Sequence, residues 1–396
     1  MKEILKIKRK YFMEAAFSNI PISEKLKTYS LVCIYLAVNS LFIIKYGEQY
    51  NIPILAGYLI IFFGLGFFYL KFHFKEFFYK TAFFLGIFFF FLFSIYLNYK
   101  VDGNTLNVDR WSAMEIGIKA VFNGQYPYNI PDHMERESSN LPVLIIFGMP
   151  FYLLFGSVGY LQSFSFLLFA YLIFKIFSDY RQRLAVLILL FLSPSYLWEI
   201  YVKSDLFSNF IIIVGSVYLI WEKFIKEKKI NSAVVSFLSA LILLTRLSAV
   251  IPLTVLLFKK FVDFSIKEKL RFTAVFLVTV IAVCYIFFQN APDFDVFLKH
   301  NPFAIQGAKQ PLILSISYIV AGCILSFKVK SFYETLLWSG VLLFICVFVP
   351  FAMFFAEYGY ENMIVNSYFD ISFFNMSMPF VMTALILGIF KNNIKV

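Results

Sequence analysis

Long apolar runs alternate with short polar segments along most of the chain, and this pattern predicts a protein embedded in a membrane. An α-helix needs about 20 apolar residues to cross roughly 30 Å of hydrocarbon, and many of the runs approach that length. The expected spans are 28–45, 52–70, 78–98, 141–155, 158–177, 184–201, 206–222, 232–245, 248–259, 270–288, 311–327, 332–355 and 370–390. We therefore expect an all-α integral membrane protein.

Two of these runs are too short to cross as straight helices, since 141–155 would reach about 22 Å and 248–259 about 18 Å. Lys and Arg concentrate in the cytoplasmic loops of membrane proteins, so their distribution indicates whether each short run crosses the membrane or returns to its own side. Most of the 35 basic residues fall on one side if 141–155 enters and leaves by the same face while 232–245 and 248–259 cross and return. The segments then expected in the cytoplasm are 1–27, 71–80, 175–183, 223–229, 259–271, 328–330 and 391–396.

This arrangement predicts about twelve transmembrane helices with re-entrant or half-length segments, in the cytoplasmic (inner) membrane, with both termini in the cytoplasm. The chain divides into a basic amphipathic N-terminus (1–27), the first three spans (28–98), an extracytoplasmic loop (99–140), a core with the short spans (141–260) and C-terminal spans (261–396) that include the outer loops 289–310 and 357–369.

Composition agrees with a membrane protein, because 61% of the residues are hydrophobic and only 15% are charged. A soluble domain of this length could not bury so much apolar surface. The net charge of +11 comes from clusters between apolar runs, so it does not indicate a nucleic-acid partner. The four cysteines all lie within apolar runs, where they are expected to pack as small apolar side chains.

The loop 99–140 is the longest polar segment, and it contains a short amphipathic helix that should lie on the outer membrane surface. The apolar positions that predict it are Trp111, Met114, Ile118 and Phe122. Asp109 stands at its N-cap position and Asn123-Gly124 at its end. The Asp109 carboxylate has two interpretations: it caps the helix by accepting backbone N–H groups, or it is a general base held over a membrane cavity.

Asp109, Gly124 and Pro127-Tyr128 together resemble the first outer loop of the GT-C superfamily, the multispanning glycosyltransferases that use polyprenyl-phosphate sugars. The likeness is to the bacterial mannosyltransferase-like branch. Three later segments are similar to that family's motifs in the same order: SSNLPVLIIFGMPFYLLFG (138–156), SPSYLWEIYVKSDLFSNFIII (193–213) with Asp205, and LTRLSAVIPL (244–253) with Arg246. The resemblance covers roughly residues 105–260.

The resemblance implies transfer of a hexose, mannose-like, from a polyprenyl-phosphate sugar to a lipid-linked or cell-envelope glycan or glycolipid acceptor, with inversion, on the extracytoplasmic face. Asp109 would deprotonate the acceptor hydroxyl. The candidates for binding the donor phosphate are Arg246, Lys299, His300, Arg110 and Lys203. The candidates for lining the acceptor or substrate cavity are Asp205, Tyr126, Tyr128, Asp370 and Asn375.

Several of these residues have a structural interpretation as well. Arg246 lies between two apolar half-spans, where an intramembrane charge points to function, but it could instead pair with Asp205 or Glu199. Asp370 could cap a helix. Asp293 and Asp295 have a spacing that can hold a divalent metal, yet such pairs are common by chance in polar loops, so no cofactor and no metal site are expected.

Two other function classes remain open. A polysaccharide polymerase or ligase would also use polyprenyl-linked glycans, but its usual mark is a late outer loop with arginines, and 357–369 contains no Lys or Arg. A transporter or flippase for lipid-linked glycans should show related halves or charges inside several full-length spans. A Gly-rich phosphate loop and a dinucleotide fingerprint are both absent from the sequence, which argues against use of a cytoplasmic nucleotide.

Overall fold

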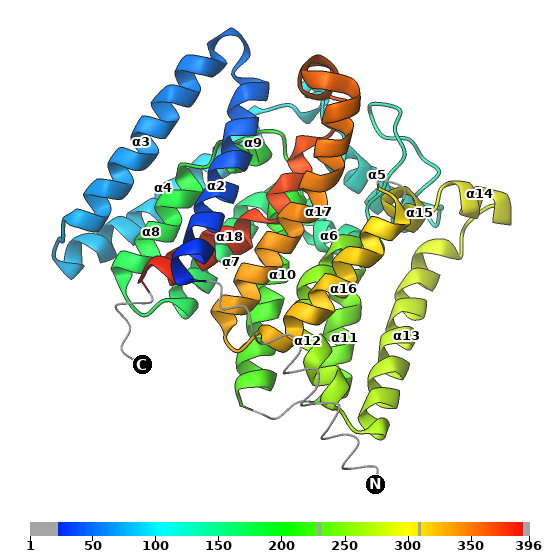
Figure 1. The fold of residues 1–396 in the computed structure, drawn as a ribbon. Helices are drawn as coiled ribbons and strands as arrows, with labels where there is room; N and C mark the ends of the chain where they lie inside the picture. The colour runs from blue at the N-terminus through cyan, green and yellow to red at the C-terminus, as the bar shows by residue number, and fades with distance from the viewer. Residues whose placement is uncertain (1–22, 228–230, 308–309, 391–396) are drawn as a thin grey trace.

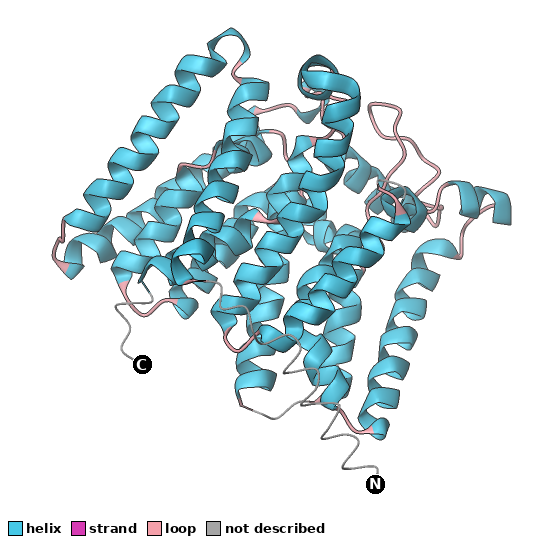
Figure 2. Cartoon of the chain, in the orientation of Figure 1, coloured by secondary structure: helices cyan, strands magenta, loops and turns pink. Residues whose placement is uncertain are grey.

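The computed structural model describes residues 23–227, 231–307 and 310–390, and within these ranges all regular structure is helical (Figures 1 and 2). The all-α expectation is therefore confirmed for this part of the chain. The predicted basic N-terminal helix lies almost wholly outside the described residues. The expected cytoplasmic placement of the two termini concerns residues 1–22 and 391–396, which also lie outside them.

Most connections between the helices are short, but residues 123–141 form a long loop. The N-terminal half contains α2 (Glu24–Tyr46), α3 (Asn51–Lys71), α4 (Glu76–Lys100), α5 (Arg110–Phe122), α6 (Pro142–Phe155), α7 (Tyr160–Ile176), α8 (Tyr180–Phe191) and α9 (Pro194–Tyr201). The C-terminal half contains α10 (Leu206–Ile220), α11 (Ser232–Leu243), α12 (Val250–Asp263), α13 (Ile266–Phe288), α14 (Phe294–Lys299), α15 (Pro302–Gly307), α16 (Leu312–Lys328), α17 (Phe332–Tyr360) and α18 (Met378–Phe390), with the 3₁₀ turns η4 (Leu247–Ala249) and η6 (Ile371–Met376).

Six of the described helical segments are long and apolar enough to cross a membrane, and the number rises to nine if each sharply bent pair counts as one span. By length and composition, this is a multi-pass helical membrane protein. The expected number of about twelve crossings is not confirmed. Two of the predicted spans correspond to α11 and α18, which have only 12 and 13 residues.

One sharp bend separates the predicted runs 141–155 and 158–177, and another interrupts the predicted run 184–201. The axes of α6 and α7 differ by 111°, and those of α8 and α9 by 64°. Gly156 ends α6 in the left-handed conformation (φ 74°), which glycine adopts without steric penalty. Pro194 starts α9 at a position where its missing N–H is not needed. The run 184–201 is thus a broken segment, and its second part carries polar side chains into the protein.

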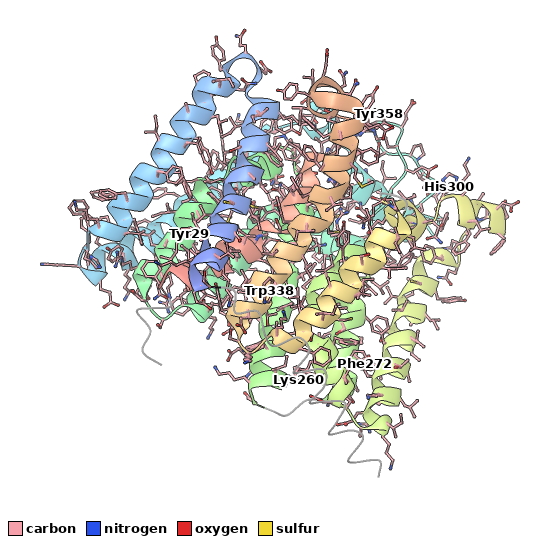
Figure 3. The ribbon with its side chains drawn as sticks, in the orientation of Figure 1. Tyr29, Lys260, Phe272, His300, Trp338 and Tyr358 are labelled. Atoms are coloured by element: carbon pink, nitrogen blue, oxygen red, sulfur yellow. The ribbon has the colours of Figure 1, made fainter. Side chains whose placement is uncertain are left out.

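The connections gather at two opposite edges of the molecule. The turns α3–α4, α7–α8, α12–α13 and α16–α17 lie along the lower edge of Figure 1, and each falls in a segment whose charge predicts one side of the membrane. The end of α17 and the helices α14 and α15 lie along the upper edge. The labelled side chains of Lys260 and His300 mark these two edges in Figure 3.

A large hydrophobic core joins α2, α7, α8, α10, α17 and α18, with α10 contributing many fully buried side chains such as Phe207 and Phe210. A smaller core packs α5 against α6 through Met114, Ile118 and Ile145. The two helices approach closely at Gly148, where an added Cβ would lie 2.4 Å from the Met114 sulfur. The short helix α5 is thus fixed on the bundle by its apolar face, as its periodicity predicts.

Candidate functional site

Segments that are far apart in the sequence bring charged side chains together at the buried side of α5. The Arg110 guanidinium lies 2.5 Å from Oδ2 of Asp370, and the Arg246 guanidinium lies 2.7 Å from Oδ2 of Asp205. Arg110 also interacts electrostatically with Asp205 and with Glu199, which links the two pairs. We call Arg110, Arg246, Asp205, Glu199 and Asp370 the charged network.

Interrupted helices position the inner members of the network. Between α9 and α10 the chain turns through Lys203, whose left-handed backbone (φ 56°) is unusual for a residue with a side chain. The turn places Asp205 directly before α10. Arg246 occupies the break between α11 and η4 in an extended conformation. Half-length helices and unwound segments of this kind surround binding sites in many membrane proteins.

Neighbouring segments satisfy the backbone groups that the α11–α12 break exposes. The Leu244 carbonyl accepts a hydrogen bond from Val143 N at 3.0 Å. The Leu247 N–H donates to Oε1 of Gln306 at 3.0 Å, and Gln306 Nε2 donates to the Ser139 carbonyl at 2.6 Å. Gln306 on α15 therefore ties this break to the segment before α6, a role that no sequence pattern indicated.

The Arg246–Asp205 pair is deeply buried, with 3% of each side chain exposed. The structural alternative for Arg246, an ion pair with Asp205, is therefore what the structure contains. The pair is incompletely satisfied, because Asp205 Oδ1 and Arg246 Nε are buried without a hydrogen-bond partner among the described residues. One acceptor and one donor thus remain available beside a neutralised pair.

Glu199 is the most enclosed member of the network. Its Oε2 accepts the Phe207 N–H at 3.0 Å, and its Oε1 accepts Nδ2 of Asn375 at 3.0 Å. Asn375 also donates to the Ser195 carbonyl at 3.3 Å. Asn375 is fully buried and joins η6 to α9, so it fixes Glu199, and its place in the acceptor cavity stays a prediction.

Asp109 stands immediately before α5, at the N-cap position expected from the sequence, but its side chain does not cap the helix. The capping interpretation of its carboxylate is therefore wrong. Its carbonyl accepts from Ala113 N at 2.9 Å and from the Ser112 hydroxyl at 2.9 Å, while its Oδ2 lies 3.1 Å from Nη1 of Arg136. With 26% of the side chain exposed, the carboxylate can be reached from outside.

The loop that follows α5 folds back over its first turn and brings Arg136 to Asp109. Asp132 Oδ1 accepts backbone N–H groups from Met134 at 2.7 Å and Arg136 at 3.2 Å, which closes a tight turn. Nδ1 of His133 lies 2.5 Å from the Ser112 hydroxyl and fixes this turn on α5. The sequence alone did not connect Arg136 with Asp109, which lie 27 positions apart, because the helix and its return loop separate them.

Asp370 has one of the two roles considered for it, that of a cap. It caps η6 by accepting the Ser372 N–H on Oδ1 at 2.9 Å, as the capping interpretation predicts. Its side chain nevertheless remains 46% exposed at the protein surface. Burial by itself would raise the pKa of Asp370, but the Arg110 guanidinium and the hydrogen bonds from Ser372 outweigh burial and lower that pKa to about 2. The carboxylate is therefore charged at neutral pH.

Lys203 lies in a different polar group, together with Glu115. Burial lowers the pKa of the Lys203 ammonium, although the charges of Glu115 and Asp102 oppose the shift. Burial raises the pKa of Glu115, whose Oε1 accepts the Val158 N–H at 3.1 Å. Both side chains meet the turn before α7, so the structure associates Lys203 with this turn and not with Arg246.

Lys299 and His300 lie at the end of α14, on the outer edge of the bundle. Lys299 is exposed, and His300 Nδ1 lies 3.1 Å from Oε1 of Glu137. The His300 carbonyl accepts the Tyr126 hydroxyl at 3.1 Å. The structure therefore places His300 against the loop 99–140 and pairs it with a carboxylate.

Tyr126 and Tyr128 do not line an open cavity. Both rings are buried and pack on Phe288 at the end of α13, with centroid distances of 6.2 and 5.4 Å. Their place in the acceptor cavity stays a prediction. The Pro127 turn instead directs both rings inward, where they fix the loop to the bundle.

The possible metal pair Asp293/Asp295 has a structural explanation. Asp293 caps α14 by accepting the Val296 N–H at 2.7 Å. Among the residues that the structure describes, no group of three or more His, Cys, Asp or Glu side chains could hold a metal ion.

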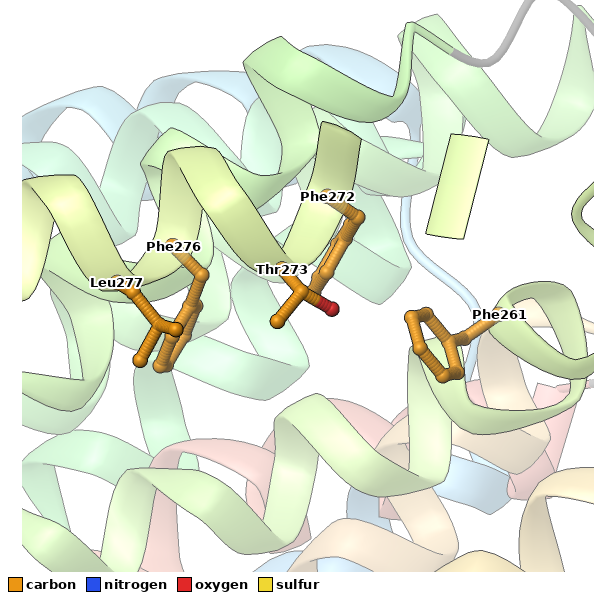
Figure 4. Close-up of a pocket in the computed structure, with 5 residues that line it drawn as sticks. All are labelled: Phe261, Phe272, Thr273, Phe276 and Leu277. Atoms are coloured by element: carbon orange, nitrogen blue, oxygen red, sulfur yellow. The ribbon is translucent and has the colours of Figure 1, made fainter. Parts of the chain in front are cut away.

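A groove of about 220 Å³ opens at the lower edge between α12 and α13 (Figure 4). Its lining residues are Phe261, Phe272, Thr273, Phe276 and Leu277. Because it offers no charged group and lies at the edge opposite His300, it is separate from the charged network.

The fold and the site define a class: an all-α, multi-pass membrane protein with a buried network of arginines and carboxylates beside a short surface helix. No family model matches the chain, and neither does a curated protein or a solved structure. The functional argument therefore depends on the residues themselves.

Proposed function

We propose that this protein is a membrane glycosyltransferase of the GT-C type. It transfers a hexose, mannose-like, from a polyprenyl-phosphate sugar to a lipid-linked or cell-envelope glycan acceptor on the extracytoplasmic face. The observation that carries the proposal is the junction at the start of α5, where an accessible carboxylate, Asp109, is followed by Arg110, which reaches into the charged network. The motif residues Asp109, Asp205 and Arg246 all interact with Arg110.

The proposed reaction needs one base and one group that stabilises the leaving phosphate. Asp109 accepts the proton of the acceptor hydroxyl as that oxygen attacks the anomeric carbon. The bond from the anomeric carbon to the phosphate oxygen breaks on the opposite face, and the lipid phosphate leaves with the electron pair. This single displacement inverts the configuration. Arg136 has to release or share the Asp109 carboxylate for the hydroxyl to approach, because it occupies Oδ2 at 3.1 Å.

We assign the leaving phosphate to Arg110 and Arg246. Guanidinium groups bind phosphate through paired N–H donors, and cations aimed at developing charge are effective in sites that exclude water. Arg246 keeps Nε without a partner among the described residues, so it can donate to a phosphate while it remains paired with Asp205. Lys203 and His300 are weaker candidates, because Lys203 lies with Glu115 and His300 with Glu137.

The test is sugar transfer by the purified protein in lipid nanodiscs, with radiolabelled polyprenyl-phosphate mannose or glucose as donor. Asp109→Asn should lower turnover by roughly 10²–10⁴-fold, as expected for loss of a general base, with thermal unfolding unchanged. Asp293→Asn is the matched control, since it alters an exposed outer carboxylate that caps α14. Transfer that survives Asp109→Asn would assign the base elsewhere.

Two outcomes would replace the proposal by one of the other function classes. Joining of whole polyprenyl-linked glycans, without use of a monosaccharide donor, would indicate a polymerase or ligase. Movement of a lipid-linked glycan across vesicle membranes, without any transfer by wild-type protein, would indicate a flippase.

A further inference from the structure

The outer end of α2 meets α9 and the 3₁₀ turn η6 in one surface region. There the rings of Tyr46 and Trp198 stack with a centroid distance of 5.1 Å and an interplanar angle of 27°. Tyr46 is 43% exposed, and Trp198 is partly exposed on α9. We call these two rings the aromatic shelf. The adjacent Lys45 ammonium lies 5.6 Å from the centroid of the Tyr46 ring.

The Asp370 carboxylate lies at the same junction. It precedes η6 and interacts electrostatically with both Lys45 and Tyr46. Its Oδ2 accepts from Arg110, and its Oδ1 accepts both the N–H and the hydroxyl of Ser372. A carboxylate oxygen can accept two hydrogen bonds, so Oδ2 retains one free lone pair on a half-exposed side chain. The carboxylate is rigidly held, charged and open to a ligand.

We propose that the aromatic shelf, Lys45 and Asp370 form a binding subsite for a neutral sugar ring. A pyranose has an apolar C–H face that packs on an aromatic ring, and hydroxyls that donate to carboxylates and accept from ammonium groups. Binding sites generally combine an apolar wall with a small number of placed polar groups, as this junction does. In the context of the proposed glycosyltransferase, on which this assignment rests, the sugar belongs to the acceptor glycan.

The charges favour a sugar over a phosphate group. The exposed polar group beside the shelf is an anion, which would repel phosphate. On the side of the shelf, Nη2 of Arg110 already donates to Asp370 and Ser372. Lys45 is the remaining cation, and it also interacts with Asp370. An uncharged ligand with several hydroxyls can hydrogen-bond to both Asp370 and Lys45 without separating the two charges.

Aromatic side chains at the ends of spanning helices can also be interfacial anchors in the membrane. The two explanations differ in their ligand. An anchor contacts lipid headgroups and affects stability in a bilayer, whereas the subsite binds soluble sugars in the absence of any lipid substrate.

The experiment is saturation-transfer NMR on the protein in nanodiscs with mannobiose, cellobiose and maltose. Wild-type protein should bind at least one of them, and Tyr46→Ala and Asp370→Asn should each weaken that binding about tenfold or more. Tyr29→Ala is the matched control, because Tyr29 is an exposed tyrosine at the opposite end of α2. The Asp370→Asn variant could unfold because Arg110 loses its partner. Tyr46→Ala does not alter that ion pair, so it still tests the subsite in that case.

The result that overturns the subsite is absence of binding by all three disaccharides, or equal binding by wild type and Tyr46→Ala. Equal binding with a lower unfolding temperature in lipid would identify Tyr46 as an anchor. Failure of the subsite is distinguishable from failure of the glycosyltransferase. Sugar transfer with an acceptor KM unchanged by Tyr46→Ala rejects the subsite alone, whereas shelf-dependent disaccharide binding without any transfer rejects the enzyme alone.

Discussion

Replacing Arg246 by methionine should strongly destabilise the protein. The substitution keeps a long side chain but removes the partner of Asp205, whose carboxylate is 3% exposed. Breaking a buried pair on one side leaves an uncompensated charge and costs about 3–5 kcal/mol. Asp205 Oδ1 already has no partner among the described residues, so the carboxylate has little local compensation. We therefore expect a loss in the upper part of that range.

The assay is thermal unfolding followed by tryptophan fluorescence, with all variants in the same lipid nanodisc. An unfolding entropy of roughly 2.1 cal/mol/K per residue converts 4 kcal/mol into a shift on the order of 5 °C for a chain of this length. Lys226→Met is the control, since Lys226 forms an exposed i,i+4 pair with Glu222. Such a surface pair contributes about 0.3–0.5 kcal/mol, so its loss should shift the unfolding temperature by less than a degree or so.

A double-variant cycle separates the ion pair from other effects of the substitution. Asp205→Asn removes the unpaired charge, so Arg246→Met combined with Asp205→Asn should recover much of the stability lost in Arg246→Met. The reasoning is refuted if Arg246→Met shifts unfolding no more than Lys226→Met does. It is also refuted if the two single losses simply add, because residues in contact should be energetically coupled.

Four further expectations test other parts of the structure. Glu115→Gln should raise the unfolding temperature above neutral pH, because burial raises the pKa of Glu115 and the wild type loses stability as pH rises through that raised value. The pH dependence expected from Asp370 has the opposite sign, because its folded-state pKa is lowered to about 2. Its contribution to the stability of the fold is present above its ordinary pKa and is lost as pH falls toward about 2, so Asp370→Asn should reduce the fall of the unfolding temperature at acid pH. Gly159→Ala should destabilise by about 1–3 kcal/mol in thermal unfolding, because its Cβ would overlap Oδ1 of Asn98. A cysteine at Asn104 should react with an impermeant reagent added outside, and labelling only from the cytoplasmic side would reject the topology.

The part of the fold that the sequence could predict follows from local pattern and charge. Apolar periodicity located α5 within two residues of its observed start. The clustering of Lys and Arg grouped connections that the structure also gathers at one edge. Helix periodicity and charge clusters depend on residues that are close together in the sequence, so both can be recognised without the structure.

The number and integrity of spans could not be predicted in the same way. The run 184–201 is continuously apolar enough to suggest one helix, yet the structure divides it at Ser193-Pro194 and bends it by 64°. Proline at the first turn of a helix starts a new helix instead of continuing the old one. The proline could therefore have indicated the break. The burial of Glu199 and its hydrogen bond with Asn375 could not be predicted, because they depend on η6, which lies far along the chain.

One of the two ion pairs was foreseen from the sequence and the other was not. The sequence offered a pair of Arg246 with Asp205 as an alternative, which the structure contains, whereas it named Arg110 and Asp370 only separately. Long-range pairing depends on tertiary packing, which is why Tyr128 faces the core and Asp109 is bound by Arg136.

The pairing also explains how a membrane protein can keep so many charges at one place. A lone arginine or carboxylate in apolar surroundings is unfavourable, whereas a neutralised pair with hydrogen bonds from broken helices is tolerated. Two atoms of the charged network, Asp205 Oδ1 and Arg246 Nε, lack hydrogen-bond partners among the described residues. Both atoms are deeply buried, since 3% of each side chain is exposed. Under the proposed function, Arg246 Nε is the donor that meets the leaving phosphate, while the ion pair with Asp205 keeps the buried guanidinium neutralised.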